Sequence, residues 1–95
     1  MIPKKRKPTH PGEILQKEFI EPMGLTQLGL AKHLKIPVQR INEIVNGKRG
    51  ITSGTAWLLA QTFGTTPEFW ANLQNNYDLY VSIPKTKVRQ LCFAN

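Results

Sequence analysis

Apolar residues recur at helical spacing along most of the chain, and the breaks between these runs fall at proline and glycine. Ile14, Leu15 and Phe19 form the first apolar stripe, and Pro11 stands at its start. Proline fits the first turn of a helix, where its missing N–H is not needed. Residues 22–24, Pro-Met-Gly, then interrupt the stripe, because proline and glycine break helices. The pattern predicts a first helix between these two points.

Two short helices are predicted next, with a tight turn between them. Thr26 is a good N-cap for the second helix, whose buried face continues through Leu30 and Leu34. The third helix begins near Pro37, and its apolar and polar residues fall on opposite faces. The sequence Asn-Gly at positions 46 and 47 ends it, since glycine readily adopts the left-handed conformation. Two such helices, the second polar on its outer face, make a helix-turn-helix.

The rest of the pattern predicts two more helices. A fourth runs from about residue 52 to Phe63, where Gly64 stops it. The fifth begins at the N-cap Thr66 and ends at Pro84, with a broad aromatic face between them. The chain is therefore expected to be an all-α, five-helix bundle with a central helix-turn-helix.

These elements divide the chain into three parts. Residues 1–9 are charged and lack an apolar period, so they are expected to form a flexible basic arm. Residues 10–84 form the helix-turn-helix domain. Residues 85–95 form a tail that could contact a second copy of the chain, and its apolar residues fit either a strand or a partial helix.

The distribution of charge indicates a polyanionic partner. The net charge is +7, and residues 1–50 hold ten Lys or Arg against four Glu, while residues 51–95 hold three against two acidic residues. A basic half beside a nearly neutral half is typical of a protein that binds a polyanion on one side. From charge alone DNA, RNA and an acidic membrane all remain open.

Several classes of protein and site are not supported by the sequence. No apolar run approaches the roughly 20 residues that a membrane span needs, and no apolar stretch follows the basic N-terminus as it would in a signal peptide. We therefore expect a cytoplasmic protein that does not bind membranes. Cys92 is the only cysteine, and no cysteine or histidine cluster has metal-ligand spacing. No catalytic arrangement is evident, so neither enzyme activity nor a cofactor is expected.

The third helix and its flanks supply the candidate DNA contacts. Arginine prefers guanine and glutamine prefers adenine, while the Glu43 carboxylate could accept from cytosine or pair with Arg40 or Gln39 one turn away. Gln27 stands at a helix N-terminus, where an amide and free backbone N–H groups can meet a phosphate. The residues expected to contact bases are Val38, Gln39, Arg40 and Glu43, and those expected to contact phosphates are Gln27, Asn42, Lys48 and Arg49.

Three longer segments carry a resemblance to a known family. They are His-Pro-Gly-Glu-Ile-Leu at 10–15, Glu-Ile-Val-Asn-Gly-Lys-Arg-Gly-Ile-Thr at 43–52, and the run at 64–79 that contains Pro-Glu-Phe-Trp-Ala-Asn-Leu-Gln. Together they resemble the HigA-type antitoxins, also named virulence-associated protein I. The helix-turn-helix itself resembles the lambdoid-repressor (XRE) type through Thr26-Gln27, Leu30-Ala31 and Asn46-Gly47-Lys48. The resemblance covers residues 10–80.

The resemblance implies a lambda-repressor-like fold and a homodimer that represses its own operon on a palindromic operator. It also implies a partner toxin, a HigB-like mRNA endonuclease that the antitoxin binds and neutralises. A free-standing repressor without a toxin is the alternative, because the same helix-turn-helix serves both. An RNA-cleaving enzyme would fit the charge but lacks a candidate catalytic cluster.

Three residues depart from the family pattern. Lys35 occupies a turn position where many relatives have glycine, so a lysine would have to adopt a positive φ. Gly29 stands where glutamate is common, which removes a capping box with Thr26. Leu58 stands where an exposed arginine is common, and it could be a single apolar residue on the surface, which we favour, or part of an interface.

Two surfaces are candidates for protein partners. The fifth helix and the tail present more apolar surface than one small core needs, which favours a dimer contact. The first helix holds Glu18 and Glu21, which could attract a basic toxin or could instead balance the helix dipole and Lys17. The residues named for a dimer or toxin interface are Glu18, Glu21, Trp70, Tyr77 and Tyr80.

Overall fold

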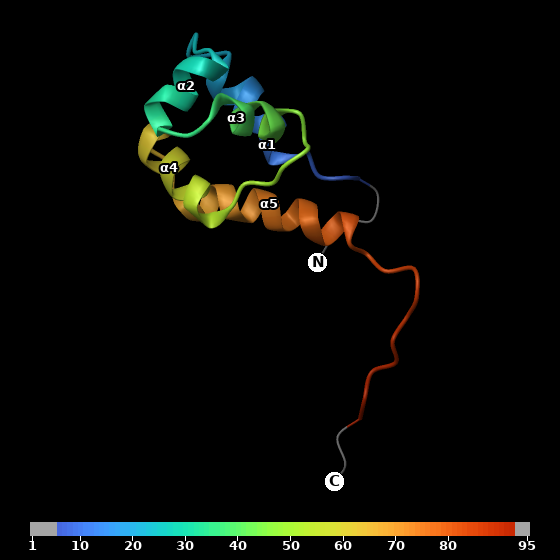
Figure 1. Cartoon of the computed structure of the whole chain (residues 1–95). Coiled ribbons are helices and arrows are strands. Elements are labelled where there is room, and N and C mark those ends of the chain that lie inside the picture. The colour runs from blue at the N-terminus through green and yellow to red at the C-terminus, as the bar shows by residue number, and fades with distance from the viewer. Residues whose placement is uncertain (1–5, 93–95) are drawn as a thin grey trace.

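A computed structural model describes residues 6–92, and within that range the chain is helical and contains no strand. The predicted all-α fold is therefore confirmed. Figure 1 shows the arrangement, with α5 running beneath the other helices. The elements are α1 (Pro11–Leu15), which continues directly as the π-helix η1 (Gln16–Ile20), then α2 (Gln27–Leu34), α3 (Val38–Val45), α4 (Ser53–Phe63) and α5 (Pro67–Val81).

The first helix changes from α to π geometry halfway along, which the pattern did not predict. The Glu21 N–H donates to the Gln16 carbonyl at 2.9 Å, a bond between residues five apart. A π turn holds more residues than an α turn. Leu15 and Ile20, also five apart, can therefore both reach the core, where they are 0% and 2% exposed.

Trp70 fills the centre of the core. Its side chain is fully buried, the rings of Phe19 and Phe69 each lie 5.0 Å from it between centroids, and its indole N–H donates to the Thr65 hydroxyl at 2.8 Å. The expected interface role is therefore wrong for Trp70, because other helices cover it within one chain. Leu58 is partly buried against the same core, so the expectation of a single surface residue is also wrong.

The start of α1 supports the end of α3 at very close range. An added Cβ on Gly12 would collide with the Ile44 carbonyl, so only glycine permits this approach. His10 caps α1 and accepts from the Gly12 N–H at 2.9 Å. Its ring also meets the edge of Tyr77 on α5, with centroids 4.8 Å apart. The start of α1 therefore contacts α3 through Gly12 and α5 through His10.

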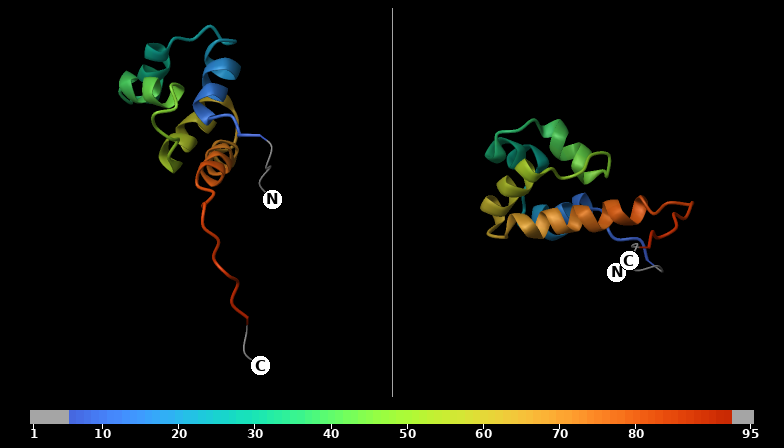
Figure 2. Two further views of the ribbon diagram at one scale, coloured as in Figure 1. Left: turned by 90° about the vertical axis from the view of Figure 1, so that its right-hand side faces the viewer. Right: turned by 90° about the horizontal axis from the view of Figure 1, so that it is seen from below.

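The helix-turn-helix and α5 lie on opposite sides of the bundle. In the right view of Figure 2, α2 and α3 occupy one side and α5 the other, with α4 joining them at one end. The described tail, residues 82–92, leaves the domain without forming a helix or a strand. The tail is thus neither of the two forms expected, and Phe93 lies outside the described residues.

Candidate DNA-binding site

The turn between α2 and α3 depends on a lysine in the left-handed conformation. Lys35 has φ 60° and ψ 41°, and it is the only described residue other than glycine with a positive φ. Its N–H bonds back to the Lys32 carbonyl at 3.2 Å, and the Ile36 N–H bonds to the Ala31 carbonyl at 3.1 Å. The prediction of a positive φ at this position is confirmed. The reversal joins α2 to α3 through three residues.

α3 buries one side and presents the other to solvent. Ile41 and Ile44 are fully buried, which fixes the helix against the rest of the domain. Gln39 and Arg40 are exposed on the outer side and make no side-chain hydrogen bond with the described residues. Val38 is 40% exposed at the first turn of the helix. These three candidate base contacts are therefore accessible together.

A chain of side-chain amides crosses from α2 to α3. The Asn42 amide donates to the Gln27 carbonyl oxygen at 3.2 Å, and the Asn46 amide donates to the Asn42 carbonyl oxygen, also at 3.2 Å. The Gln27 oxygen is thus occupied, and its NH₂ group remains to donate at the N-terminus of α2. The spacing of Asn42 and Asn46, four apart on one helix, is a signal that could have revealed half of this network.

Glu43 pairs with a residue that sequence reasoning did not propose. Its carboxylate accepts from Arg49 Nε at 2.9 Å, and the two side chains are 31% and 49% exposed. Of the two alternatives for Glu43, the pairing with Arg40 or Gln39 is not the one that the structure shows, because the carboxylate pairs with Arg49. Gly47, at φ 75°, turns the chain so that the N–H groups of residues 48 and 49 bond to the Glu43 carbonyl. This return brings Arg49 back beside the helix.

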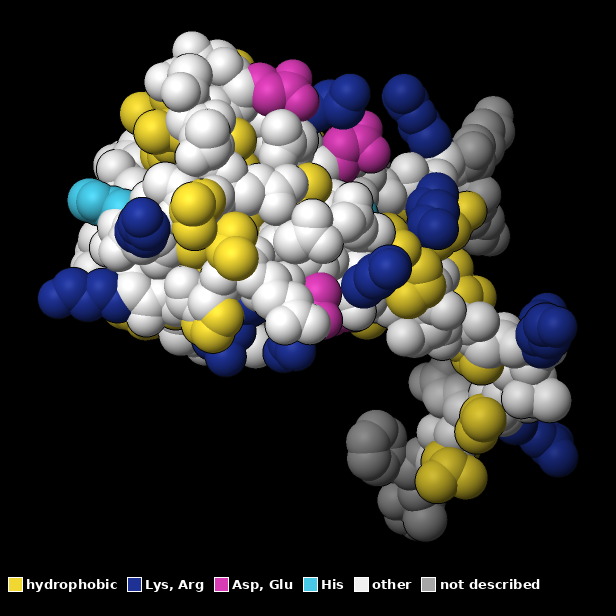
Figure 3. Space-filling model, turned by 45° about the horizontal axis from the view of Figure 1, so that its top comes forward, with side chains coloured by type: hydrophobic (Ala, Val, Ile, Leu, Met, Phe, Trp, Pro, Cys, Tyr) yellow, Lys and Arg dark blue, Asp and Glu magenta, His cyan; other side chains and the backbone are white. Residues whose placement is uncertain are grey.

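The pair forms one side of a shallow groove along α3. The groove is lined by Pro37, Gln39, Arg40, Glu43 and Arg49. Two cations and one acid therefore face it, together with a glutamine that can donate and accept. Lys48 is exposed beside it. Figure 3 shows Lys and Arg side chains around the rim of one face of the molecule and along the tail. A groove with these groups suits a base edge flanked by phosphates.

No helix among the described residues is long and apolar enough to cross a membrane. The cations, the amide and the carboxylate of this groove lie on α3 and the loop that follows it.

Comparison with known proteins gives the same family throughout. A helix-turn-helix family model matches residues 16–70. Virulence-associated protein I of Dichelobacter nodosus is 51% identical over 74% of this chain and 65% of its own length. Antitoxin HigA-1 of Vibrio cholerae is 41% identical over 80% of this chain and 71% of its own.

Solved structures agree. An addiction-module antidote protein of the HigA family from Coxiella burnetii has a TM-score of 0.77 at 50% identity, covering 82% of this chain and 85% of its own. The Pseudomonas aeruginosa antitoxin HigA, solved with the higBA promoter, has a TM-score of 0.78 at 40% identity, covering 79% and 82%. This family binds DNA and is not enzymatic. The chain belongs to the XRE-type helix-turn-helix superfamily and, within it, to the family of HigA-type antitoxins.

Proposed function

We propose that this protein represses its own operon as a dimer on a palindromic operator, and that it binds and neutralises a cognate mRNA-endonuclease toxin. The observation that carries the DNA half is the exposed pair Gln39 and Arg40, which lie on α3 without internal hydrogen bonds among the described residues. Relatives of this fold have been solved with operator or promoter DNA. DNA readers need such free donors and acceptors facing the major groove.

Each residue of the groove has a chemical role in the proposal. Arg40 donates to guanine, Gln39 exchanges two hydrogen bonds with adenine, and Val38 packs against a thymine methyl. Glu43 holds Arg49 through one carboxylate oxygen and keeps the other for a cytosine amino group. Specificity for each half-site then comes from three consecutive positions of α3 together with Glu43 one turn further along the helix.

Phosphate contacts flank the base contacts. Gln27 would donate its NH₂ group to a phosphate at the N-terminus of α2, where the helix dipole favours an anion. Asn42 fixes that orientation through the hydrogen bond at 3.2 Å. Lys48 and Arg49 follow α3 in an exposed loop, and such cations position a protein on the DNA backbone without reading sequence.

The second half of α5 is the proposed dimer surface. Leu79, Val81 and Ile83 are 47%, 51% and 53% exposed, and Tyr77 and Tyr80 are half-buried beside them. A helix end that leaves several large apolar side chains exposed is typical of a subunit interface. Two-fold pairing would place two recognition helices about 10 bp apart or a multiple of that. Sedimentation should show a dimer that a chain ending at residue 78 does not form.

Binding of a toxin distinguishes the proposed function from that of a free-standing repressor. An antitoxin gene of this type is expected beside a reading frame for a short basic protein, because a nuclease must hold phosphates. Co-expression followed by copurification distinguishes the two functions. A neighbour that does not copurify with this chain would favour the repressor alone.

Anisotropy titration of the DNA upstream of the gene tests the DNA half. Gln39→Ala with Arg40→Ala should weaken operator binding at least tenfold and remove the preference over a scrambled duplex, since each base contact is worth about 1–3 kcal/mol. The matched control is Gln61→Ala with Lys17→Ala, which removes one amide and one cation outside the helix-turn-helix. Equal operator affinity for the two double variants would contradict the assignment of α3.

A further inference from the structure

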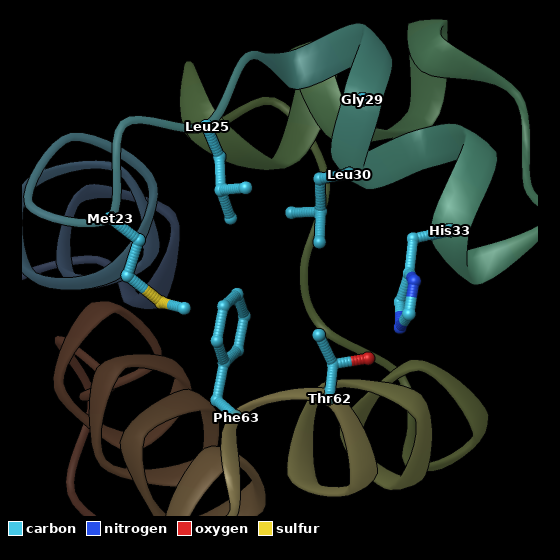
Figure 4. Close-up of a pocket in the computed structure, with 7 residues that line it drawn as sticks. All are labelled: Met23, Leu25, Gly29, Leu30, His33, Thr62 and Phe63. Atoms are coloured by element: carbon cyan, nitrogen blue, oxygen red, sulfur yellow. The ribbon is translucent and has the colours of Figure 1, made fainter.

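An apolar pocket of about 340 Å³ opens between the turn after η1, α2 and α4. Figure 4 shows side chains from all three elements pointing into one space. Leu25, Leu30 and Phe63 line its interior. Met23 forms one edge at 58% exposure, so the pocket communicates with solvent. A space of this size has room for a large apolar side chain.

Gly29 helps to keep the pocket open. It lines the pocket from α2 without a side chain, although glycine inside a helix costs about 1 kcal/mol relative to alanine. A Cβ at this position would contact only the Thr26 hydroxyl, at 3.1 Å. The backbone therefore does not require glycine here, and φ is not in the left-handed region. The absence of a side chain at residue 29 enlarges the pocket mouth.

The charge beside the pocket identifies the kind of partner. The molecule as a whole is +7, so a basic protein is repelled by most of its surface. Glu18 and Glu21 are exposed just before Met23 in the chain, and neither forms an ion pair with a described residue. The Gln16 amide donates to the Glu21 carboxylate at 3.0 Å and holds it in place. This edge attracts cations locally.

The opposite edge of the pocket carries positive charge. Lys32 and Lys35 are exposed at the C-terminal end of α2, on either side of His33 in the chain, and His33 lines the pocket. A basic partner is therefore held toward the first helix and kept from the end of α2. The charges thus fix an orientation as well as a site.

We propose that the pocket receives an apolar side chain of the basic toxin, whose neighbouring cations pair with Glu18 and Glu21. This inference rests on the toxin half of the proposed function. Methionine adapts to varied partners because its side chain is flexible and polarizable, which suits Met23 at the rim. The pocket is lined by the turn after η1, α2 and α4, and the base contacts proposed on α3 are not among its lining residues, so operator and toxin can be bound together.

Calorimetry with the purified short basic protein encoded beside this gene tests the proposal. Met23→Lys and Thr62→Arg, on opposite rims, should each weaken binding at least tenfold, because each places a cation at the pocket mouth. Leu28→Lys is the matched control, since Leu28 is 52% exposed on α2 and does not line the pocket. It should change the affinity less than threefold. Circular dichroism and operator titration check that each variant is folded.

The outcomes distinguish a failure of the toxin half of the proposed function from a failure of the pocket assignment. If the wild-type chain does not bind the neighbouring protein, the toxin half of the proposed function fails and the pocket assignment falls with it. If the wild type binds and both rim variants bind equally well, the pocket assignment alone is overturned. Equal loss with Leu28→Lys would likewise exclude the pocket as the anchor.

Discussion

The side of the domain that carries α3 and the side that carries the pocket are built differently, although both include residues of α2. On the α3 side, polar side chains are held by hydrogen bonds from Asn46 through Asn42 to Gln27. On the pocket side, apolar side chains from three segments line a cavity. DNA offers a regular lattice of phosphates, which favours donors that are already oriented. A protein partner brings its own side chain, so a cavity serves better than a fixed donor.

The largest effect is expected from a substitution that disturbs the packing of α1 against α3. Gly12→Ala should lower the free energy of unfolding by about 1–3 kcal/mol, the usual cost of overpacking, because the new Cβ collides with the Ile44 carbonyl. Displacement of α3 should weaken operator binding as well. Chemical denaturation and operator titration measure the two effects.

Gly54→Ala is the control for that substitution. A Cβ at Gly54 meets nothing within 4 Å, and alanine is the better helix former. Its stability should be unchanged or slightly higher. An equally stable Gly12→Ala variant would show that α1 and α3 do not depend on the close approach.

A charge reversal of two glutamates tests the proposed acidic contact beside the pocket. Glu18→Lys with Glu21→Lys should weaken toxin binding by up to about thirtyfold, since two exposed ion pairs contribute up to about 2 kcal/mol. Operator affinity and folding should be retained. Glu68→Lys, at the exposed first turn of α5, is the matched reversal and should leave toxin binding unchanged. Calorimetry that finds no loss for the double variant would move the acidic contact elsewhere.

A smaller effect is expected from Glu43, an acidic residue on the α3 side of the domain. Glu43→Gln removes a carboxylate from the groove proposed to bind DNA and releases Arg49 from its ion pair at 2.9 Å. Affinity for random duplex should rise by about two- to fivefold, as expected for an exposed pair, and more than affinity for the operator. Titrations of both duplexes at two salt concentrations measure the ratio. An unchanged ratio would mean that Glu43 does not affect selectivity.

The smallest effect concerns pH and the junction at His10. Burial lowers the pKa of His10 below the usual 6.5, more than nearby Asp78 raises it, and Lys7 lowers it further. The folded chain thus favours neutral His10, whose Nδ1 accepts from Gly12. Stability from this group is complete above pH 6.5 and is lost as pH falls toward the folded pKa. His10→Asn keeps an N-cap that does not titrate, so its denaturation midpoint should vary less between pH 8 and pH 5.

Local chemistry made the helices and the turn predictable. Thr26 and Thr66 cap their helices as expected, each accepting from the N–H three residues on. Lys35 takes the positive φ that the motif requires. Nothing in these cases depends on distant parts of the chain, because caps and turns are settled within a few residues.

Features that depend on tertiary packing were not predictable. An apolar face does not reveal which of its residues other helices cover, so Trp70 was assigned to an interface although it is fully buried. The π turn follows from the need to bury Leu15 and Ile20 together. Arg49 reaches Glu43 only because Gly47 reverses the chain. Residues from three separate segments line the pocket, so no local sequence pattern could predict it.

The central claim is that the two partners bind separate sides of one small domain. Its most direct test measures operator and toxin affinity for the wild type, Arg40→Ala, Met23→Lys and the double variant. Arg40→Ala should lose operator affinity alone and Met23→Lys toxin affinity alone, with additive losses in the double variant, as for independent sites. A variant that loses both affinities while remaining folded would contradict the separation of the two surfaces.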